Sequence, residues 1–265
     1  MEFSPDHGAR DSLLGLNPSW QYVNTGANTG SFNMQFDEEL ARQLHEGQGK
    51  PTLRFFQWKP PAISLGYHQK CDDLNERKCR EDGIDVVRRP TGGRGILHAE
   101  DLTYSIVMYA PHGTISRTYN AISRALVKGL ALYGVEATLA RSQSSSSRQH
   151  AHAALIPCFT SCARHEIEWR GRKLVGSAQR RYSNGEIDIV LQHGSILCGP
   201  AHRKLGDYLL CRDSHLTKQL AQELEEKTID LKEIRGSEVD PDELAACLKR
   251  GFEAEWGIRF SLSSL

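Results

Sequence analysis

The sequence between residues 88 and 105, RRPTGGRGILHAEDLTYS, decides the fold. It begins at the end of an expected strand at 84–89. Gly92, Gly93 and Gly95 fall in the turn that follows, where the absence of side chains lets a ligand approach the backbone amide groups closely. A tight connection between two strands would need the same glycines. The pattern matches neither the Walker nor the Rossmann glycine motif, so it does not support a nucleotide site of either kind.

A second informative stretch is GRKLVGSAQR at 171–180. Lys173 opens an expected strand of small and apolar residues, and strand alternation would point its side chain to the same face as Val175 and Ser177. A lysine directed into a site can polarise a carbonyl group or stabilise a thiolate. The alternative is a solvated lysine on the surface of the strand.

The third stretch, PCFTSC at 157–162, follows a serine-rich tract at 142–147 that we expect to be a mobile loop. A loop cysteine beside cationic groups can act as a nucleophile, whereas a cysteine buried among apolar side chains is inert. Cys158 and Cys162 could instead form a redox pair or hold a metal. No second cysteine pair has the spacing of a structural zinc site, which argues against the metal.

The composition limits the class of protein. The chain has 265 residues, with 33 basic and 33 acidic side chains, so its formal net charge is zero and gives no general attraction to nucleic acid. No window is apolar enough to span a membrane or to act as a secretory signal. The cysteines number seven, and an odd number suits reduced thiols better than a disulfide framework. We therefore expect a cytoplasmic protein with a flexible leader at 1–18 and a single domain at 19–265.

Hydrophobic periodicity and turn residues predict a mixture of strands and helices. A helix capped by Ser31 extends to about Glu46 and buries Phe36, Leu40 and Leu44. Because the strands do not alternate strictly with helices, the pattern predicts an α+β sandwich. The remaining expected elements are strands at 52–58 and 62–67, paired as a hairpin or a bent pair, further strands at 84–89, 102–109, 166–169, 173–180 and 186–197, and helices at 72–81, 116–133, 213–226 and 241–256.

The stretches at 88–105 and 171–180 together resemble the two signatures of the lipoate-protein ligase and octanoyltransferase superfamily, and the similarity extends from about Trp20 to Phe260. The resemblance implies the α+β fold of biotin/lipoate protein ligases, with mixed and antiparallel sheets flanked by helices. In that fold the glycine motif lines an acyl tunnel, and the signature lysine, matched by Lys173, stands at its mouth. The substrate-binding positions that the resemblance implies are Arg89, Thr91, Gly92, Gly93, Gly95, Gly176, Ser177, Ala178 and His193.

Within this superfamily, the chain is more similar to the cysteine-dependent octanoyltransferases of the Bacillus type than to the ligases. Residues 92–95 are Gly-Gly-Arg-Gly, as in those transferases, whereas ligases typically have Gly-Gly-Gly-Ala. Cys158 matches the transferase nucleophile, a short distance before the lysine motif. The chain differs at Ala99, where the transferases usually have Asp, and at 161–165, where SCARH replaces a Pro-Ser-Trp-Tyr-like stretch.

The resemblance therefore implies transfer of an octanoyl group from octanoyl-acyl carrier protein to Cys158, and then to a lysine of a lipoyl domain of a 2-oxoacid dehydrogenase or of glycine-cleavage H protein. Lys173 would bind the carbonyl oxygen, and His98 would assist proton transfer, orient the site or serve only the structure. No cofactor, metal, nucleic acid or membrane enters this scheme. The alternatives are an ATP-dependent lipoate or octanoate ligase, a lipoyl-domain amidotransferase, and a non-catalytic module for thiol redox or metal binding.

Overall fold

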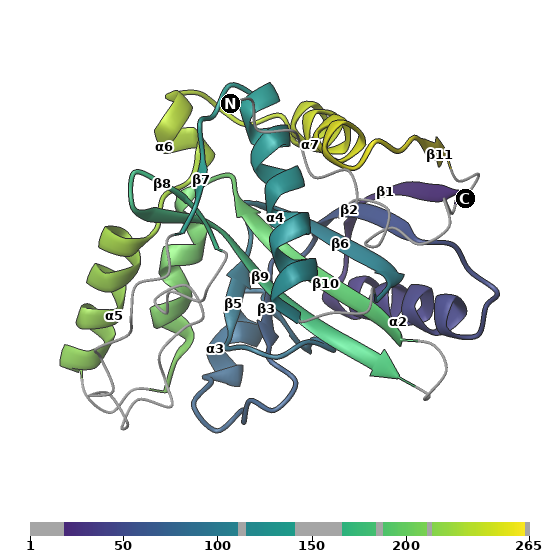
Figure 1. Ribbon diagram of the computed structural model, residues 1–265. Helices are drawn as coiled ribbons and strands as arrows, with labels where there is room; N and C mark the ends of the chain where they lie inside the picture. Colours follow the sequence, from purple (N-terminus) through teal and green to yellow (C-terminus); the bar gives the residue numbers. More distant parts are fainter. Residues whose placement is uncertain (1–18, 111–114, 141–165, 184–187, 211–213, 263–265) are drawn as a thin grey trace.

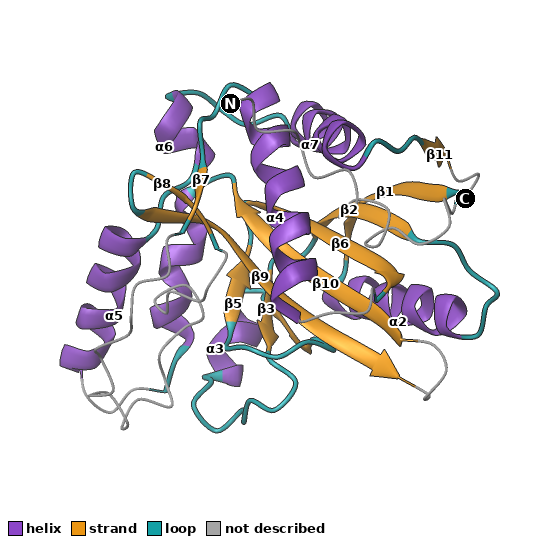
Figure 2. Cartoon of the chain, viewed as in Figure 1, coloured by secondary structure: helices purple, strands orange, loops and turns teal. Residues whose placement is uncertain are grey.

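The computed structural model describes residues 19–110, 115–140, 166–183, 188–210 and 214–262. The strands of these residues form two sheets (Figure 1, Figure 2). The larger sheet has the strand order β11-β1-β2-β6-β10-β9-β8-β7, and the smaller has the order β4-β3-β5. The strands are β1 (Trp20–Asn28), β2 (Thr52–Trp58), β3 (Ala62–Leu65), β4 (Asp85–Arg88), β5 (Ile96–His98), β6 (Asp101–Tyr109), β7 (Thr138–Leu139), β8 (Ile167–Trp169), β9 (Arg172–Ser183), β10 (Asp188–Leu197) and β11 (Phe260–Leu262).

The larger sheet is mixed. β1 is parallel to both β2 and β11, whereas every pair from β2 through β6, β10, β9 and β8 to β7 is antiparallel. In β6 the first eight residues are all buried, since this strand lies in the middle of a sheet that is covered on both faces. The predicted α+β fold with mixed sheets flanked by helices is confirmed.

Helices cover both faces of the larger sheet (Figure 1). α4 and α7 pack against each other and against the face that carries Phe55, Tyr104 and Val190. α2 covers the opposite face, where Ala41 and Leu44 join the apolar cluster of β6 and β10. None of the described helices combines the length and the apolar character that a membrane span requires. The helices are α2 (Gly30–His45), α3 (Glu76–Glu81), α4 (Ile115–Leu132), the 3₁₀ helix η2 (Pro200–Tyr208), α5 (Ser214–Lys227), α6 (Leu231–Arg235) and α7 (Pro241–Trp256).

The smaller sheet packs beside α3 and η2. Ile63 of β3 shares an apolar cluster with Cys79 of α3 and Leu205 of η2. The loop between β4 and β5 reaches the larger sheet, where the Arg180 guanidinium of β9 donates a hydrogen bond to the Pro90 carbonyl at 3.2 Å. The glycine-rich stretch therefore lies between the two sheets.

The start and the buried side of α2 differ from the expectation. Thr29 caps the helix instead of Ser31, because the Thr29 hydroxyl accepts a hydrogen bond from the Phe32 amide at 3.3 Å. Phe36 and Leu40, expected on the buried face, are only partly buried. The helix therefore buries a different face from the one that apolar periodicity predicts.

A buried arginine explains this difference. Arg54 of β2 and Asp37 of α2 are fully buried and form an ion pair at 2.7 Å. Arg54 also donates to Asn33 Oδ1 at 2.7 Å and to Thr25 Oγ1 at 2.9 Å, and its guanidinium lies 3.9 Å from the centre of the Phe56 ring. Because a buried charge must be paired and hydrogen-bonded, α2 turns its polar residues toward Arg54.

Two further expectations are wrong in detail. Of the two arrangements expected for 52–58 and 62–67, the hairpin is wrong, because β2 belongs to the larger sheet and β3 to the smaller. The helix expected at 72–81 begins only at Glu76, where the Asn75 side chain accepts a hydrogen bond from the Lys78 amide at 3.1 Å. The short elements β5, β11, η2 and α6 carry no clear periodic signal.

The backbones of α4 and α7 touch where two glycines face each other. A Cβ atom added at Gly251 would lie 2.4 Å from Gly129 N and 2.6 Å from the Ala125 carbonyl oxygen. A Cβ atom added at Gly129 would lie 2.6 Å from the Cα atom of Leu248. Only glycine at both positions allows this close approach.

We predict that Gly251→Ala lowers the free energy of unfolding by about 1–3 kcal/mol, the usual cost of overpacking. Alanine favours an isolated helix over glycine by up to about 1 kcal/mol, so helix propensity alone has the opposite sign. Urea denaturation of the two proteins measures the difference. A variant more stable than the parent would show that α4 and α7 are not in close contact at this point.

Candidate active site

A narrow pocket opens where the two sheets meet. β6, β9 and β10 contribute one wall, β3 and β5 the other, and Met34 of α2 and Trp58 of β2 lie at one side. The pocket contains about 430 Å³ of empty space, part of it open to solvent. The two walls leave only a narrow gap between them. The pocket is therefore a slot rather than a wide cavity.

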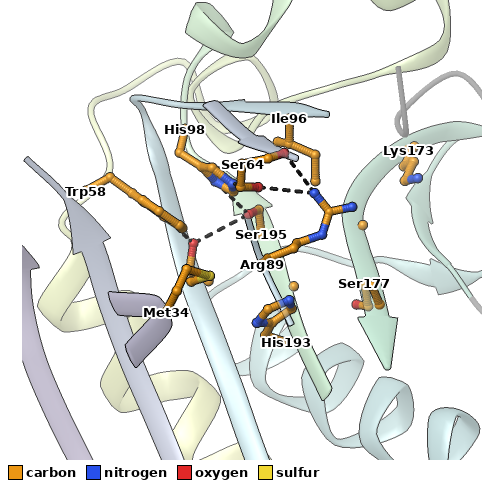
Figure 3. Close-up of a pocket in the computed structure, with 14 residues that line it drawn as sticks. Met34, Trp58, Ser64, Arg89, Ile96, His98, Lys173, Ser177, His193 and Ser195 are labelled. Carbon is orange, nitrogen blue, oxygen red and sulfur yellow. Dashed lines mark hydrogen bonds between the residues drawn. The ribbon is translucent and has the colours of Figure 1, made fainter. Parts of the chain in front are cut away.

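Both signature stretches contribute to this pocket. Figure 3 shows Lys173 on one side, His98 and Trp58 on the other, and Arg89 between them. Cys158 lies outside the described residues, so its position stays a prediction. The predicted site residues that the structure places in the pocket wall are Arg89, His98, Lys173, Gly176, Ser177, Ala178 and His193.

Arg89 fixes the shape of the glycine-rich loop. It is only 3% exposed, and its guanidinium donates to the carbonyl oxygens of Ser64 at 2.9 Å, Gly92 at 2.8 Å and Arg94 at 2.8 Å. A planar guanidinium presents its donors in a rigid arrangement, so these bonds hold the loop in one conformation. Arg89 also lines the pocket, where it supplies a buried positive charge.

The glycines of the motif shape the loop more than they line the pocket. A Cβ atom at Gly66 would lie 1.9 Å from the Gly93 carbonyl oxygen, so the loop packs directly against the backbone after β3. Gly93 has a φ of 96°, which favours glycine. Gly92 and Gly93 line a second, more open groove on the outer side of the loop, and Gly95 is buried.

A chain of buried hydrogen bonds connects the loop to the larger sheet. Thr91 Oγ1 lies 2.5 Å from His193 Nε2, and His193 Nδ1 lies 3.4 Å from Asp37 Oδ2. Burial lowers the pKa of His193, so its ring is neutral near pH 7, donates from Nδ1 to the carboxylate and accepts from the Thr91 hydroxyl at Nε2. Burial alone would raise the pKa of Asp37, but the hydrogen bond from His193 and the charge of Arg54 hold it below its usual range. The loop is thereby tied to the core.

His98 is held on both sides of its ring. Nε2 lies 2.8 Å from Ser64 Oγ, and Nδ1 lies 2.9 Å from Asp101 Oδ2. The ring stacks on Trp58 at a centroid distance of 4.0 Å, and Trp58 Nε1 donates to Thr103 Oγ1 at 2.8 Å. Since protein groups engage both ring nitrogens, these contacts hold the ring in one orientation.

Lys173 is a buried cation and not a solvated surface lysine. It is 7% exposed, and its ammonium donates to the carboxylate of Glu166. Its carbonyl oxygen accepts a hydrogen bond from Ile229 N at 3.0 Å, and Arg172 Nε donates to the Thr228 carbonyl at 2.8 Å. A fixed ammonium in a narrow slot is a suitable donor to an oxygen atom that gains negative charge during a reaction.

Small residues keep β9 and β10 close together beside the pocket. Ser177 lines the pocket as Lys173 does, whereas Val175, expected on the same face, belongs to the apolar core. A Cβ atom at Gly194 would lie 2.5 Å from Ser177 Oγ, so the strand pair leaves no room for a side chain there. The Tyr104 hydroxyl lies 2.7 Å from Ser177 Oγ, and burial raises the pKa of Tyr104 to about 12, which keeps it protonated.

Several residues of the pocket wall were not predicted from the sequence. Gly194 and Ser195 follow His193 directly, and two small residues inside an apolar strand are a sign of close backbone packing. Ser64 and Thr103 belong to the site only because β3 and β6 face each other, which periodicity does not reveal. The wall residues that the sequence analysis missed are Met34, Trp58, Ser64, Ile96, Thr103, Gly194 and Ser195.

Comparisons with known proteins support the family resemblance that the sequence motifs indicate. Residues 29–253 match the model of the lipoyl protein ligase A/B catalytic domain. Octanoyltransferase LipM of Kyrpidia tusciae is 32% identical over 252 residues, which cover 93% of this chain and 90% of that protein. Octanoyltransferase LipM of Clostridioides difficile is 33% identical over 246 residues, which cover 91% of this chain and 88% of that protein.

Solved structures share the fold. A bi-partite lipoate protein ligase from Thermoplasma acidophilum, studied with its E2 lipoyl domain, has a TM-score of 0.72 at 19% identity and covers 93% of this chain and 87% of its own. A lipoate-protein ligase A bound with ATP has a TM-score of 0.72 at 20% identity. The match covers 94% of this chain and 90% of that protein. At these identities the likeness concerns the fold alone. Together with the family model and the relatives, it shows that this chain belongs to the lipoyl protein ligase A/B catalytic domain family.

Proposed function

We propose that this chain is an octanoyltransferase of lipoate biosynthesis, which moves an octanoyl group from octanoyl-acyl carrier protein through Cys158 to a lysine of a lipoyl domain. The observation that carries the proposal is 32% identity with an octanoyltransferase over nearly the full length of both proteins. The names of the relatives specify octanoyl transfer. The donor, the cysteine intermediate and the acceptor are extensions that rest on the sequence motifs.

In the first step the Cys158 thiolate attacks the thioester carbonyl of the donor. A carbon–sulfur bond to Cys158 forms, the bond to the carrier's sulfur breaks, and the carrier leaves as a thiolate, which takes up the proton that Cys158 had lost. One thioester replaces another, so the step is nearly isoenergetic and needs no ATP. The carbonyl oxygen gains negative charge in the tetrahedral intermediate, and we assign Lys173 as the donor that stabilises it.

In the second step the amine of the acceptor lysine attacks the acyl-Cys158. The lysine belongs to a lipoyl domain of a 2-oxoacid dehydrogenase or to glycine-cleavage H protein. The carbon–nitrogen bond forms, the nitrogen loses a proton, and the Cys158 thiol is restored. Since an amide is more stable than a thioester, this step makes the whole reaction favourable.

The shape of the pocket supports the binding of an acyl chain. Lys173 stands at one side of the slot, so the carbonyl group belongs there. The chain would then extend between the sheets toward Trp58 and Met34, past Ile96. Because His98 is stacked on Trp58 and bonded at both nitrogens, we assign it the role of holding this part of the wall in place.

Three other functions compete with this proposal. A ligase would activate free octanoate or lipoate with ATP and magnesium, and a lipoyl-domain amidotransferase would use the same cysteine with a different donor. A non-catalytic module would use Cys158 and Cys162 for redox or metal chemistry. The similarity to the structure of lipoate-protein ligase A bound with ATP does not favour a ligase function, because 20% identity shows a shared fold only.

We predict that Cys158→Ala abolishes octanoyl transfer and that Cys162→Ala retains most of it, because only Cys158 matches the nucleophile position. Intact-mass measurement after incubation with octanoyl-acyl carrier protein should show one added octanoyl group on the parent and on Cys162→Ala, and none on Cys158→Ala. If Cys162→Ala is the variant without the adduct, the nucleophile is Cys162.

Lys173→Met is expected to slow formation of the acyl-enzyme by about 10²- to 10³-fold, the usual effect of removing one preorganised donor to an oxyanion. Methionine retains most of the volume but removes the cationic partner of Glu166, so we expect a folded variant of lower stability. Rapid-quench measurement of the acyl-enzyme gives the rate, and circular dichroism checks the fold. An unchanged rate in a folded variant would remove Lys173 from the mechanism.

The requirement for ATP separates the transferase from the ligase. A thioester donor is already activated, so we expect transfer from octanoyl-acyl carrier protein to a lipoyl domain without any nucleotide. Free octanoate with ATP and magnesium should give little product. Strong labelling by free octanoate that depends on ATP and is undiminished in Cys158→Ala would establish a ligase instead.

A further inference from the structure

The ammonium of Lys173 is held by a carboxylate that lies outside both signature stretches. Glu166 and Lys173 form an ion pair in which the two side chains are 6% and 7% exposed. Glu166 directly precedes β8, and Lys173 is the second residue of β9. The tight turn between the strands contains Arg170 and Gly171, both with positive φ values of 50° and 79°. This hairpin brings the pair together.

The register of the hairpin makes Glu166 the partner of Lys173 instead of a nearer candidate. Glu168 lies directly opposite Lys173, but it is only partly buried, and among the described contacts no ion pair joins the two. Ile167 pairs with Val175, so β9 has one extra residue, Leu174, directly after Lys173. A bulge of this kind changes the direction of nearby side chains. Glu168 is therefore a natural control for Glu166.

We infer that Glu166 is a positioning residue, which holds the Lys173 ammonium in place and directs it at the carbonyl oxygen of the acyl group. The inference rests on the proposed function of Lys173 as the donor to that oxygen. An ammonium carries three N–H donors, so it can bond to Glu166 and to a substrate oxygen at the same time. An isolated ammonium is costly to remove from water, and the adjacent carboxylate offsets this cost.

The main chain at Lys173 is fixed without Glu166. Ile229 N donates to the Lys173 carbonyl at 3.0 Å, and Arg172 donates to the Thr228 carbonyl at 2.8 Å. What the backbone contacts do not fix is the long, flexible lysine side chain. Loss of Glu166 should therefore weaken the hold on the ammonium and leave the strand in place.

The test measures single-turnover octanoyl transfer from octanoyl-acyl carrier protein in the full chain. We expect Glu166→Gln to slow acyl-enzyme formation by at least about 10-fold, while Glu168→Gln stays within about 2-fold of the parent. Glu166→Asp keeps the charge on a shorter side chain and should restore part of the rate. Equal rates for Glu166→Gln and Glu168→Gln would overturn the inference.

A double variant separates positioning from a general loss of structure. If Glu166 acts through Lys173, adding Glu166→Gln to Lys173→Met should not slow the reaction further. The double variant should also unfold at a temperature no lower than Lys173→Met, because it no longer buries a carboxylate that has lost the Lys173 ammonium. A further loss of rate in the double variant would assign Glu166 a role that does not pass through Lys173.

Acyl-enzyme formation by the parent protein distinguishes an error in the proposed function from an error in the inference about Glu166. If the parent forms no acyl-enzyme, the proposed function is wrong and the inference falls with it. If the parent is active and Glu166→Gln is as fast as Glu168→Gln, only the inference is wrong. Should Glu166→Gln not fold, Glu166→Asp and the double variant supply the same comparison.

Discussion

The buried ion pair between Arg54 and Asp37 is the constraint on which the rest of the structure depends. Both charges are completely removed from water, which is tolerable only when every polar atom around them has a partner. Asp37 therefore accepts from Ser105 of the neighbouring strand and contacts His193, which in turn holds Thr91 in the glycine-rich loop. A requirement of the core thus fixes α2, the middle of the larger sheet and one wall of the pocket in a single arrangement.

The pocket belongs to neither sheet alone, which explains why the family motif has two parts. The first part builds the loop through the Arg89 guanidinium, and Pro90 and Thr91 bring it against the larger sheet. The second part supplies Lys173 and the small residues that let β9 and β10 approach closely. Proteins that share this fold include one with bound ATP, so the fold does not choose the chemistry. The side chains at the junction make that choice.

Strong periodicity made much of the fold predictable, and weak or polar signals account for the errors. The helix at Pro241–Trp256 has the predicted bounds, since it combines a capping aspartate, a proline at its first position and a regular apolar face. Three-residue strands such as β5 and β11 gain their stability from their neighbours, so sequence alone gives no signal for them. Lys173 was found by its signature, whereas Glu166 was missed because a bulge decides which acidic residue reaches it. Cys158 remains a prediction from the sequence.

The parallel pairing of β1 with β11 has a consequence for biosynthesis. Trp20 pairs with Phe260, and its ring packs against Trp256 at 5.1 Å and against Phe260 at 6.1 Å. A ribosome therefore completes almost the whole chain before the edge of β1 can be covered. Contacts between such distant residues form slowly, and an uncovered strand edge pairs readily with other chains. The nascent protein thus passes through an interval in which it is prone to aggregate and a suitable client for chaperones that bind exposed strands.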